Sequence, residues 1–461
     1  MTATWEDANP LIVVLTRDQR ESRILTVNPA TGATELLRKD NDDKWLDIVP
    51  GVPARTSSGH IVWTADADNA RRLLVATPED LASGEAKPVT PADLQVREVL
   101  DVDGDTVLFT ASKDPAEVHL WTHSQEAGLT QLTTDPGVHS GRAAGGTTLT
   151  TTRTLKANGV TVQVLRQDAW GESHQATIKS AAETPNLPAP SPAILKTGPR
   201  EIPTAVLFPS WHKPGEAKLP VLLDPYGGPH AQRVLAAAGL YLTSQWFAEQ
   251  GFAVVIADGR GTPARGPEWE RAVQNDLATP VLDDQIEALH AAAAQFTDLD
   301  LGKVAIRGWS FGGYLSALAV LRRPDIFHAA VAGAPVTDWH LYDTLYTERY
   351  LGHPDTNATA YTASSLLNDP ERPSGSGVSP GGSVVSSQRP LLLIHGLADD
   401  NVVAAHTLRL SSALLAAGYP HSVLPLSGVT HMTPQEVVAE NLLLLQVDFL
   451  RRALNISAPA I

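Results

Sequence analysis

The sequence contains no cysteine, which excludes disulfides, thiolate zinc sites and cysteine nucleophiles. Long apolar runs are also absent. The amino-terminal run 11–15 is short and follows Glu6 and Asp7, where a secretory signal needs basic residues, and no run approaches the roughly 18 apolar residues of a membrane span. Basic residues are not in excess, since the net charge is -16. We therefore expect neither nucleic acid nor a membrane as partner. These absences together predict a cytoplasmic location.

What the chain does contain is typical of a globular protein. Hydrophobic residues make up 43% and charged residues 19%, so the chain has enough apolar surface to fold without being membrane-like. At 461 residues it is too long for one ordinary hydrophobic core. We therefore expect two domains, over 1–185 and 186–461.

A weak repeat runs through the first domain. Its copies begin with short apolar strand candidates that end at Thr16, Thr64 and Thr110, a spacing of roughly 45–50 residues, such as one four-stranded propeller blade occupies. Each of these strand candidates is followed by a second apolar strand and a polar turn, as hairpins require. The segment 147–166 resembles a further copy of the repeat. This predicts a propeller-like all-β domain of three to four blades that is incomplete, because closed propellers have roughly four to eight; the alternative is an open β-sandwich. The paired strand candidates are Val13–Thr16 with Arg23–Val27, Ile61–Thr64 with Arg72–Val75, and Val107–Thr110 with Val118–Trp121.

The pattern changes after the proline-rich segment 184–192. Apolar strand runs now alternate with longer helical stretches, which predicts a mostly parallel sheet covered by helices, as in an α/β-hydrolase. A Gly- and Ser-rich tract, 374–387, is predicted to be a flexible insertion. Strands are expected at 220–223, 253–256, 303–306, 329–331 and 391–394, and helices at 282–296, 313–321 and 404–417.

The strongest chemical signal is Gly308-Trp309-Ser310-Phe311-Gly312, a G-x-S-x-G between a predicted strand and an apolar helix. In that context it predicts a nucleophile elbow, whose glycines leave room for a sharp turn. Ser310 would lie at the amino terminus of the helix, where backbone N–H groups can meet a developing negative charge. We therefore predict Ser310 as the nucleophile.

A serine nucleophile needs a histidine base oriented by an acid, and in this fold the acid precedes the histidine in the chain. We expect the acid in the loop after strand 391–394 and choose Asp399, although spacing alone does not separate it from Asp400. His406 falls in a helical pattern and His421 opens a strand, so both have structural explanations. His431 lies in a small loop after the last predicted strand and is our candidate base.

Stabilisation of the tetrahedral intermediate needs hydrogen-bond donors. The backbone N–H of Phe311 is the first, because it follows the nucleophile. The glycine-rich turn 224–229 contains Tyr226, whose hydroxyl could supply a second donor. From the turn alone, an ordinary turn residue is an equally good explanation of Tyr226.

Five motifs between Leu219 and Leu450 carry a resemblance to a known family: Pro225–Pro229, Asp258–Gly261, Gly308–Tyr314, Tyr346–Tyr350 and His395–Val402. On these motifs the chain resembles the dipeptidyl peptidase IV branch of the prolyl oligopeptidase family. The tyrosine-rich motif is the most specific to this branch, and generic esterases are not expected to carry it.

The resemblance implies that Tyr226 is the second oxyanion donor, that Asp399 is the acid and that Asn401 binds the substrate backbone. It also implies an aromatic pocket for proline, whose ring is compact, apolar and without an N–H. Without the resemblance, Trp339, Tyr342 and Tyr346 could instead form one face of a helix packed in the core. The pocket residues implied are Phe311, Val336, Trp339, Tyr342, Tyr346 and Val402.

Relatives in this branch carry a complete propeller, in which an acidic pair captures the free amino terminus of the substrate. Neither Glu6-Asp7 nor the acidic run 40–43 matches that motif. No residue is therefore assigned to this role.

Together these observations predict a serine peptidase that cleaves after proline or alanine and releases amino-terminal dipeptides through an acyl-enzyme on Ser310. No metal or cofactor is expected, the partners are peptide substrates, and the family suggests a homodimer. Alternatives with the same triad are an oligopeptidase, an acylaminoacyl peptidase or a carboxylesterase. A further alternative is an inactive, truncated homologue that serves as a binding scaffold.

Overall fold

The computed structural model describes residues 2–4, 9–167, 173–369, 388–433 and 435–459, and the predicted Gly/Ser insertion lies outside them. Contacts divide the chain into two units, which are described separately. The β unit comprises residues 1–186 and also two short segments, 235–240 and 263–271, that the sequence pattern assigned to the second domain. The α/β unit comprises the remaining residues.

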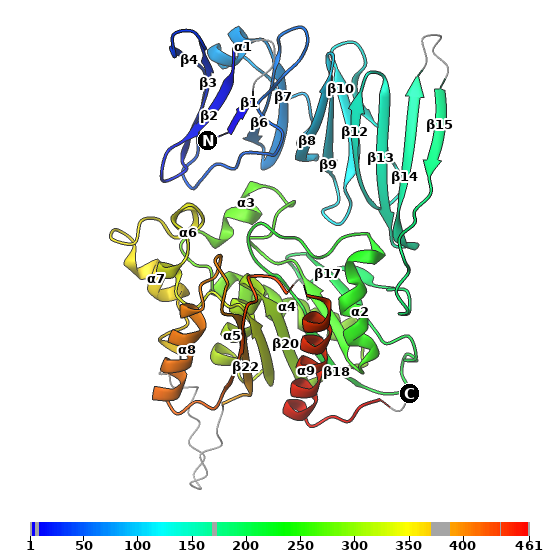
Figure 1. Ribbon diagram of the computed structural model, residues 1–461, viewed down its shortest axis with the longest axis vertical. Coiled ribbons are helices and arrows are strands. Elements are labelled where there is room, and N and C mark those ends of the chain that lie inside the picture. The colour runs from blue at the N-terminus through cyan, green and yellow to red at the C-terminus, as the bar shows by residue number, and fades with distance from the viewer. Residues whose placement is uncertain (1, 5–8, 168–172, 370–387, 434, 460–461) are drawn as a thin grey trace. The chain divides into compact units, whose positions relative to one another are not determined.

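Four antiparallel sheets follow one another along the β unit (Figure 1). Three have four strands, and the sheet of β5, β6 and β7 has three. Each predicted strand pair is a hairpin within one sheet, and the region 147–166 forms a fourth, so the propeller-like architecture is confirmed. The elements are β1 (Thr2–Thr4), β2 (Leu11–Leu15), β3 (Glu21–Val27), β4 (Thr34–Asn41), β5 (Ala54–Arg55), β6 (Ile61–Ala67), β7 (Ala70–Ala76), α1 (Pro78–Ser83), β8 (Gln95–Asp103), β9 (Thr106–Ser112), β10 (His119–Ser124), β11 (Gly128–Gln131), β12 (Val138–Ala144), β13 (Thr147–Thr154), β14 (Ala157–Gln167) and β15 (Ser173–Ile178).

The first three sheets share one hydrophobic core. Alternate residues of their strands, such as Val13, Ile24 and Phe109, are fully buried in it, as expected for strands with one face turned inward. The fourth sheet contributes Ala143 to a much smaller cluster around Leu120. Because burial of apolar side chains is the main stabilising term, the first three sheets form the stable body of the β unit.

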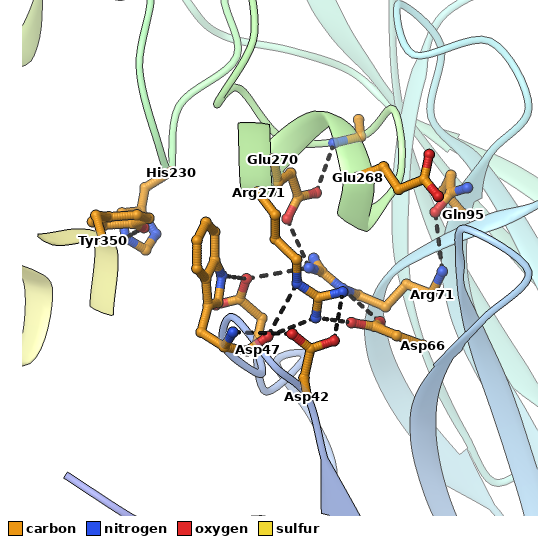
Figure 2. A network of polar contacts seen from close by, with 12 residues as sticks. Asp42, Asp47, Asp66, Arg71, Gln95, His230, Glu268, Glu270, Arg271 and Tyr350 are labelled. Atoms are coloured by element: carbon orange, nitrogen blue, oxygen red, sulfur yellow. Dashed lines mark hydrogen bonds and ion pairs between the residues drawn. The ribbon is translucent and has the colours of Figure 1, made fainter. Parts of the chain in front are cut away.

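A charged network joins the segment 263–271 to the strands of the β unit (Figure 2). The segment contains α3 (Pro267–Glu270). Arg71 Nη2 lies 2.7 Å from Glu270 Oε2, and Arg271 Nη2 lies 2.6 Å from Asp66 Oδ2. Burial alone would lower the pKa of Arg71, but Glu270 and two aspartates outweigh it and raise that pKa above its usual value. The Arg71 guanidinium therefore stays charged and holds the segment in place. Arg71 also pairs with Asp47, and Arg271 with Asp42 and with the carbonyl oxygen of Trp45.

The α/β unit is built on one sheet of eight strands, in the order β16-β17-β19-β18-β20-β21-β22-β23. From β19 to β23 neighbouring strands are parallel, whereas β16 and β17 are antiparallel. Helices α2 and α9 pack into the hydrophobic cluster on one face, and α4 and α5 contact each other on the opposite face, so the α/β-hydrolase fold is confirmed. The strands are β16 (Ala193–Thr197), β17 (Ile202–Leu207), β18 (Leu219–Leu223), β19 (Ala253–Ala257), β20 (Leu299–Trp309), β21 (Ala329–Gly333), β22 (Leu391–Gly396) and β23 (Ser422–Leu426).

The helices of the second half agree in place with the predicted ones. The three predicted stretches correspond to α4, α5 and α8, with ends shifted by a few residues because apolar spacing does not mark the terminal turns of a helix. The helical elements are η1 (Ala238–Tyr241), α2 (Leu242–Glu249), η2 (Arg271–Val273), α4 (Thr279–Gln295), α5 (Phe311–Arg322), η3 (Trp339–Leu341), α6 (Thr344–Leu351), α7 (Ala358–Ser364), α8 (Ala405–Ala416) and α9 (Glu436–Leu454).

Candidate active site

Ser310 occupies a strained turn between β20 and α5. Its φ of 59° and ψ of -118° lie outside the usual regions for a residue with a side chain, and such strain costs about 1–3 kcal/mol. Its N–H donates to Gly333 O at 2.9 Å. A Cβ on Gly308 would lie 2.3 Å from Gly312 O, and one on Gly312 would lie 2.6 Å from Pro225 O. The elbow therefore requires both glycines of the motif.

Asp399 and His431 form a hydrogen-bonded pair. His431 Nδ1 lies 2.8 Å from Asp399 Oδ2, and the Asp399 side chain is fully buried. The other carboxylate oxygen accepts the N–H groups of Asn401 and Val402 at 3.0 and 2.8 Å. Asp400 is exposed. The structure thus separates the two aspartates that spacing alone left open, because only Asp399 bonds the imidazole.

The loop of His431 is joined to the elbow through Trp309. The Trp309 indole N–H donates to His431 O at 2.7 Å, so the residue just before Ser310 holds the backbone of the candidate base. Within the described residues, no hydrogen bond links Ser310 Oγ to His431. Hydrogen bonds of this type are often formed only in the complex with substrate. Sequence analysis assigned no role to Trp309, although it lies inside the motif.

Tyr226 lies in the loop after β18, beside the residue that follows Ser310. Its ring centroid is 5.9 Å from that of Phe311. Burial raises the pKa of Tyr226 to about 12, with Tyr342 as a smaller cause, so its hydroxyl remains protonated and can donate at neutral pH. A Cβ on Gly228 would lie 2.2 Å from the Phe311 ring, and glycine is therefore needed for this close approach.

A buried charged group supports the Tyr226 loop and was missed by the sequence analysis. Asp224 directly follows β18 and accepts from Ser244 Oγ at 2.8 Å and from Arg233 Nη2 at 3.0 Å, and it is paired with Arg307. Burial would raise the pKa of Asp224, but the two arginines outweigh it and lower that pKa. An ionised carboxylate therefore fixes the start of the loop. An acidic residue directly after an apolar strand was the available signal.

The aromatic residues implied by the family resemblance form one cluster. Trp339 and Tyr346 are stacked at 6.0 Å between ring centroids with an interplanar angle of 4°. Tyr342 contacts both rings, at 6.1 and 5.1 Å, and Phe311 lies 5.9 Å from Trp339. Val336 and Val402 are buried.

These aromatic residues do not share one helix, which was the alternative explanation of their spacing. Trp339 begins η3, Tyr342 follows it in extended conformation with ψ 163°, and Tyr346 belongs to α6. Tyr342 Oη donates to Asn401 Oδ1 at 3.5 Å. Asn401 therefore lies between the aromatic cluster and the Asp399 loop.

Further aromatic contacts escaped the sequence analysis. Trp339 Nε1 and Tyr314 Oη both donate to Ser364 O, at 3.1 and 2.8 Å, which fixes the orientation of the indole. His230 Nε2 and Tyr350 Oη are 2.8 Å apart (Figure 2). Tyr314 and Tyr350 both lie in motifs that carry the family resemblance, but the hydrogen-bond partners of their hydroxyls are seen only in the structure.

The described residues contain no group of three or more histidine, aspartate or glutamate side chains placed to hold a metal ion. No helix among them is both long and apolar enough to cross a membrane.

The parallel sheet and the serine elbow define the α/β unit as an α/β-hydrolase. The model of the prolyl oligopeptidase family matches residues 239–457, and that of the dipeptidyl peptidase IV (DPP IV) N-terminal region matches residues 1–150. The chain is therefore similar to the prolyl oligopeptidase family over most of its α/β unit and to the dipeptidyl peptidase IV N-terminal region over most of its β unit, in agreement with the resemblance carried by the five motifs.

Individual relatives agree with this family. Dipeptidyl peptidase 8 of Mus musculus is 42% identical over 213 residues, which are 46% of this chain and 22% of that protein. Probable dipeptidyl-aminopeptidase B of Coccidioides posadasii (strain C735) is 28% identical over 442 residues, 89% of this chain and 46% of that protein. The chain thus spans less than half the length of either relative.

The fold comparison extends over both units. The crystal structure of Porphyromonas gingivalis dipeptidyl peptidase 4 matches with a TM-score of 0.82 and 24% identity, over 96% of this chain and 62% of that one. A putative dipeptidyl aminopeptidase IV from Bacteroides ovatus ATCC 8483 gives the same TM-score at 22% identity, over 98% of this chain and 66% of that one. These similarities establish the fold.

Proposed function

We propose that this chain is a serine peptidase that cleaves after proline or alanine and releases amino-terminal dipeptides. The observation that carries the proposal is the buried Asp399–His431 pair, 2.8 Å apart, whose loop is bonded to the residue before the strained Ser310. The similarity of the chain to this family and its dipeptidyl peptidase relatives support the substrate class.

In the proposed mechanism, Ser310 Oγ attacks the carbonyl carbon after proline, and His431 Nε2 takes the hydroxyl proton. Asp399 holds the other imidazole nitrogen and stabilises the imidazolium. The N–H of Phe311 and the hydroxyl of Tyr226 bind the oxyanion. His431 then returns the proton to the leaving amine, and water hydrolyses the acyl-enzyme by the same steps.

The aromatic cluster supports selection of proline. A proline ring fits a rigid apolar slot and leaves no N–H unpaired there, and the stacked Trp339 and Tyr346 provide flat apolar surface. We assign Val336 and Val402 to the same pocket and Asn401 to the substrate backbone. No residue is assigned to the free amino terminus of the substrate.

The direct test uses the purified chain with a glycyl-prolyl anilide. We expect dye release that Ser310→Ala abolishes, while the control Ser412→Ala, at an exposed position on α8, has no effect. A fluorophosphonate probe should label the wild type and not Ser310→Ala. Equal turnover by both proteins would end the proposal.

Three substrates distinguish the alternatives with the same triad. A dipeptidyl peptidase prefers the free dipeptide anilide, an oligopeptidase or acylaminoacyl peptidase prefers an amino-blocked one, and a carboxylesterase cleaves only the simple ester. Failure of the probe to label the chain would instead favour a binding scaffold without turnover.

A cytoplasmic location and a homodimer belong to the same proposal. The first is tested by fractionation of the source cells and the second by sedimentation equilibrium. Recovery in a membrane fraction, or a monomer at all concentrations, would contradict them.

A further inference from the structure

The first turn of α8 carries two adjacent side chains, His406 and Thr407, that are almost completely buried. His406 bonds the loop that carries Thr337 and Asp338. Thr407 bonds His395 on β22, which in turn bonds the loop of the acid. Neither His406 nor Thr407 belongs to the proposed triad or to the aromatic cluster. The contacts of His406 and those of Thr407 indicate that this turn positions parts of the candidate active site.

His406 bonds the loop that carries part of the aromatic cluster. Its Nδ1 accepts the N–H of Thr337 at 3.1 Å and that of Asp338 at 3.4 Å. The Thr337 hydroxyl donates to His406 O at 2.7 Å. Val336 and Trp339 flank these two residues, so the imidazole and the carbonyl of His406 fix the backbone from which both side chains project.

His395, near the end of β22, bonds the loop of the acid. Its Nε2 lies 2.7 Å from Val402 O and must donate, because a carbonyl oxygen only accepts. Its Nδ1 therefore accepts from Thr407 Oγ1, also at 2.7 Å. The N–H of Val402 in turn donates to Asp399 Oδ1 at 2.8 Å. Contacts thus lead from Thr407 through His395 and the backbone of Val402 to the carboxylate that orients His431.

We propose that His406 and His395 are positioning residues with separate tasks: His406 sets the geometry of the aromatic cluster, and His395 sets that of the acid. This inference rests on the proposed function. Both are positioning residues, because their hydrogen bonds go to the protein backbone and to Thr407; His395 Nε2 also lies 3.6 Å from Asp399 Oδ2, the oxygen that pairs with His431.

Both imidazoles are neutral at neutral pH. Burial lowers the pKa of His395 and lowers that of His406 to about 4. Their hydrogen bonds fix the tautomers, with the proton on Nε2 in each case. For His406 that Nε2 is buried without a hydrogen-bond partner among the described residues, so Nδ1 makes all the hydrogen bonds of its imidazole.

The fixed tautomers define matched pairs of variants. Asparagine places an acceptor oxygen near the position of histidine Nδ1, whereas glutamine places an N–H donor near that of Nε2. His406→Asn should therefore preserve function, and His406→Gln should not. At His395 the order is reversed, because the essential group there is the Nε2 donor.

Two readouts separate the two tasks. One is the ratio of kcat/KM for glycyl-prolyl and glycyl-alanyl anilides, which depends on the pocket. The other is the rate of fluorophosphonate labelling of Ser310, which depends on the triad. Displacements near 1 Å can cost about 100-fold in rate, so effects on the order of 10- to 100-fold are expected.

For His406→Gln we expect the proline preference to fall about 10-fold, mainly through KM, with labelling within about threefold of wild type. For His395→Asn we expect labelling and both kcat values to fall about 10- to 100-fold with the proline preference unchanged. His406→Asn and His395→Gln should recover most of each loss.

Equal losses in the two variants of either histidine would overturn the proposal, because a merely structural side chain shows no such tautomer preference. If a histidine variant fails to fold by circular dichroism, Thr337→Val and Thr407→Val replace it. Each removes one hydroxyl of the same network and should give a weaker form of the same effect; wild-type values in both would overturn the proposal.

The readouts also separate this inference from the proposed function. A wild-type chain that is labelled but cleaves neither anilide refutes the proposed function and, with it, the role of His406. The role of His395 is still decided by the labelling rates. A wild-type chain that resists the probe overturns both.

Discussion

Acidification should destabilise the α/β unit through His406. Burial lowers the pKa of His406 from 6.5 to about 4, with smaller effects from Asp338, His395, Arg409 and Asp399. As pH falls, His406 therefore binds a proton in the unfolded chain before it does so in the folded chain. The contribution of neutral His406 to the free energy of unfolding is complete above pH 6.5 and is lost as pH falls through about 4.

The size of this destabilisation follows from the pKa values of His406 in the unfolded and the folded chain. The gap between 6.5 and about 4 corresponds to a maximum of about 3 kcal/mol in the free energy of unfolding. About 1 kcal/mol is lost between pH 7 and pH 5.5, and about 2 kcal/mol by pH 4.5. No discount for solvent screening applies, because the side chain is fully buried.

Urea denaturation of the wild type and of His406→Asn at these three pH values measures the effect. Asparagine does not titrate, so the wild type should lose about 2 kcal/mol more than the variant between pH 7 and pH 4.5. The control His290→Asn, at an exposed histidine on α4, should follow the wild type. Equal pH slopes for wild type and His406→Asn would refute the burial of a neutral imidazole at this position.

Three further predictions concern other parts of the chain. Tyr226→Phe should lower kcat about 100- to 1,000-fold with little change in KM; a loss below threefold would contradict an oxyanion donor. In Gly313→Ala the new Cβ would lie 2.2 Å from Gly333 O, so α5 must shift, and we expect a lower Tm and at least about a 100-fold loss of kcat/KM, whereas wild-type values would show that the elbow tolerates the shift. Arg71→Met leaves three buried or partly buried carboxylates without their shared cation and should cost about 3–5 kcal/mol in urea denaturation, whereas Arg23→Met, at a half-exposed pair, should have little effect; similar costs would refute the network.

The elbow was predictable because its sequence motif is local. A Cβ on Gly308 would collide with the backbone of Gly312, within the motif, whereas a Cβ on Gly312 would meet Pro225 O in the loop after β18. The strand before Ser310 and the helix after it are visible as apolar runs. A pattern of adjacent residues therefore carried the position of the candidate nucleophile.

The partners of Asp399 were not predictable in the same way. Asp399 and Asp400 are adjacent and chemically identical, and only the buried one meets His431, 32 positions later. His406 was explained by its helical pattern alone, and its contacts with Thr337 come from a loop 69 positions earlier. Side-chain pairing across such separations depends on how strands are ordered in the sheet.

The charged network of the β unit shows the same limit. Glu270 and Arg271 lie in a stretch of the second domain by sequence, yet they pair with Arg71 and Asp66 in the first. No hydrophobic periodicity in the sequence predicts these ion pairs, because a short helix with charged residues has the same pattern as an exposed segment. Its burial against opposite charges exists only in the folded chain.

The amino-acid sequence by itself determined the strand hairpins, the alternation of strands and helices in the second half, the serine elbow and the family resemblance, since each depends on short-range backbone sterics or on nearby residues. Tertiary structure alone decided which aspartate bonds His431, how three aromatic rings on separate elements come into contact, and which histidines hold the loops. These depend on hydrogen bonds and ring contacts between residues that are distant in the chain. Their geometry is specified only when the sheet order and the buried surfaces have formed.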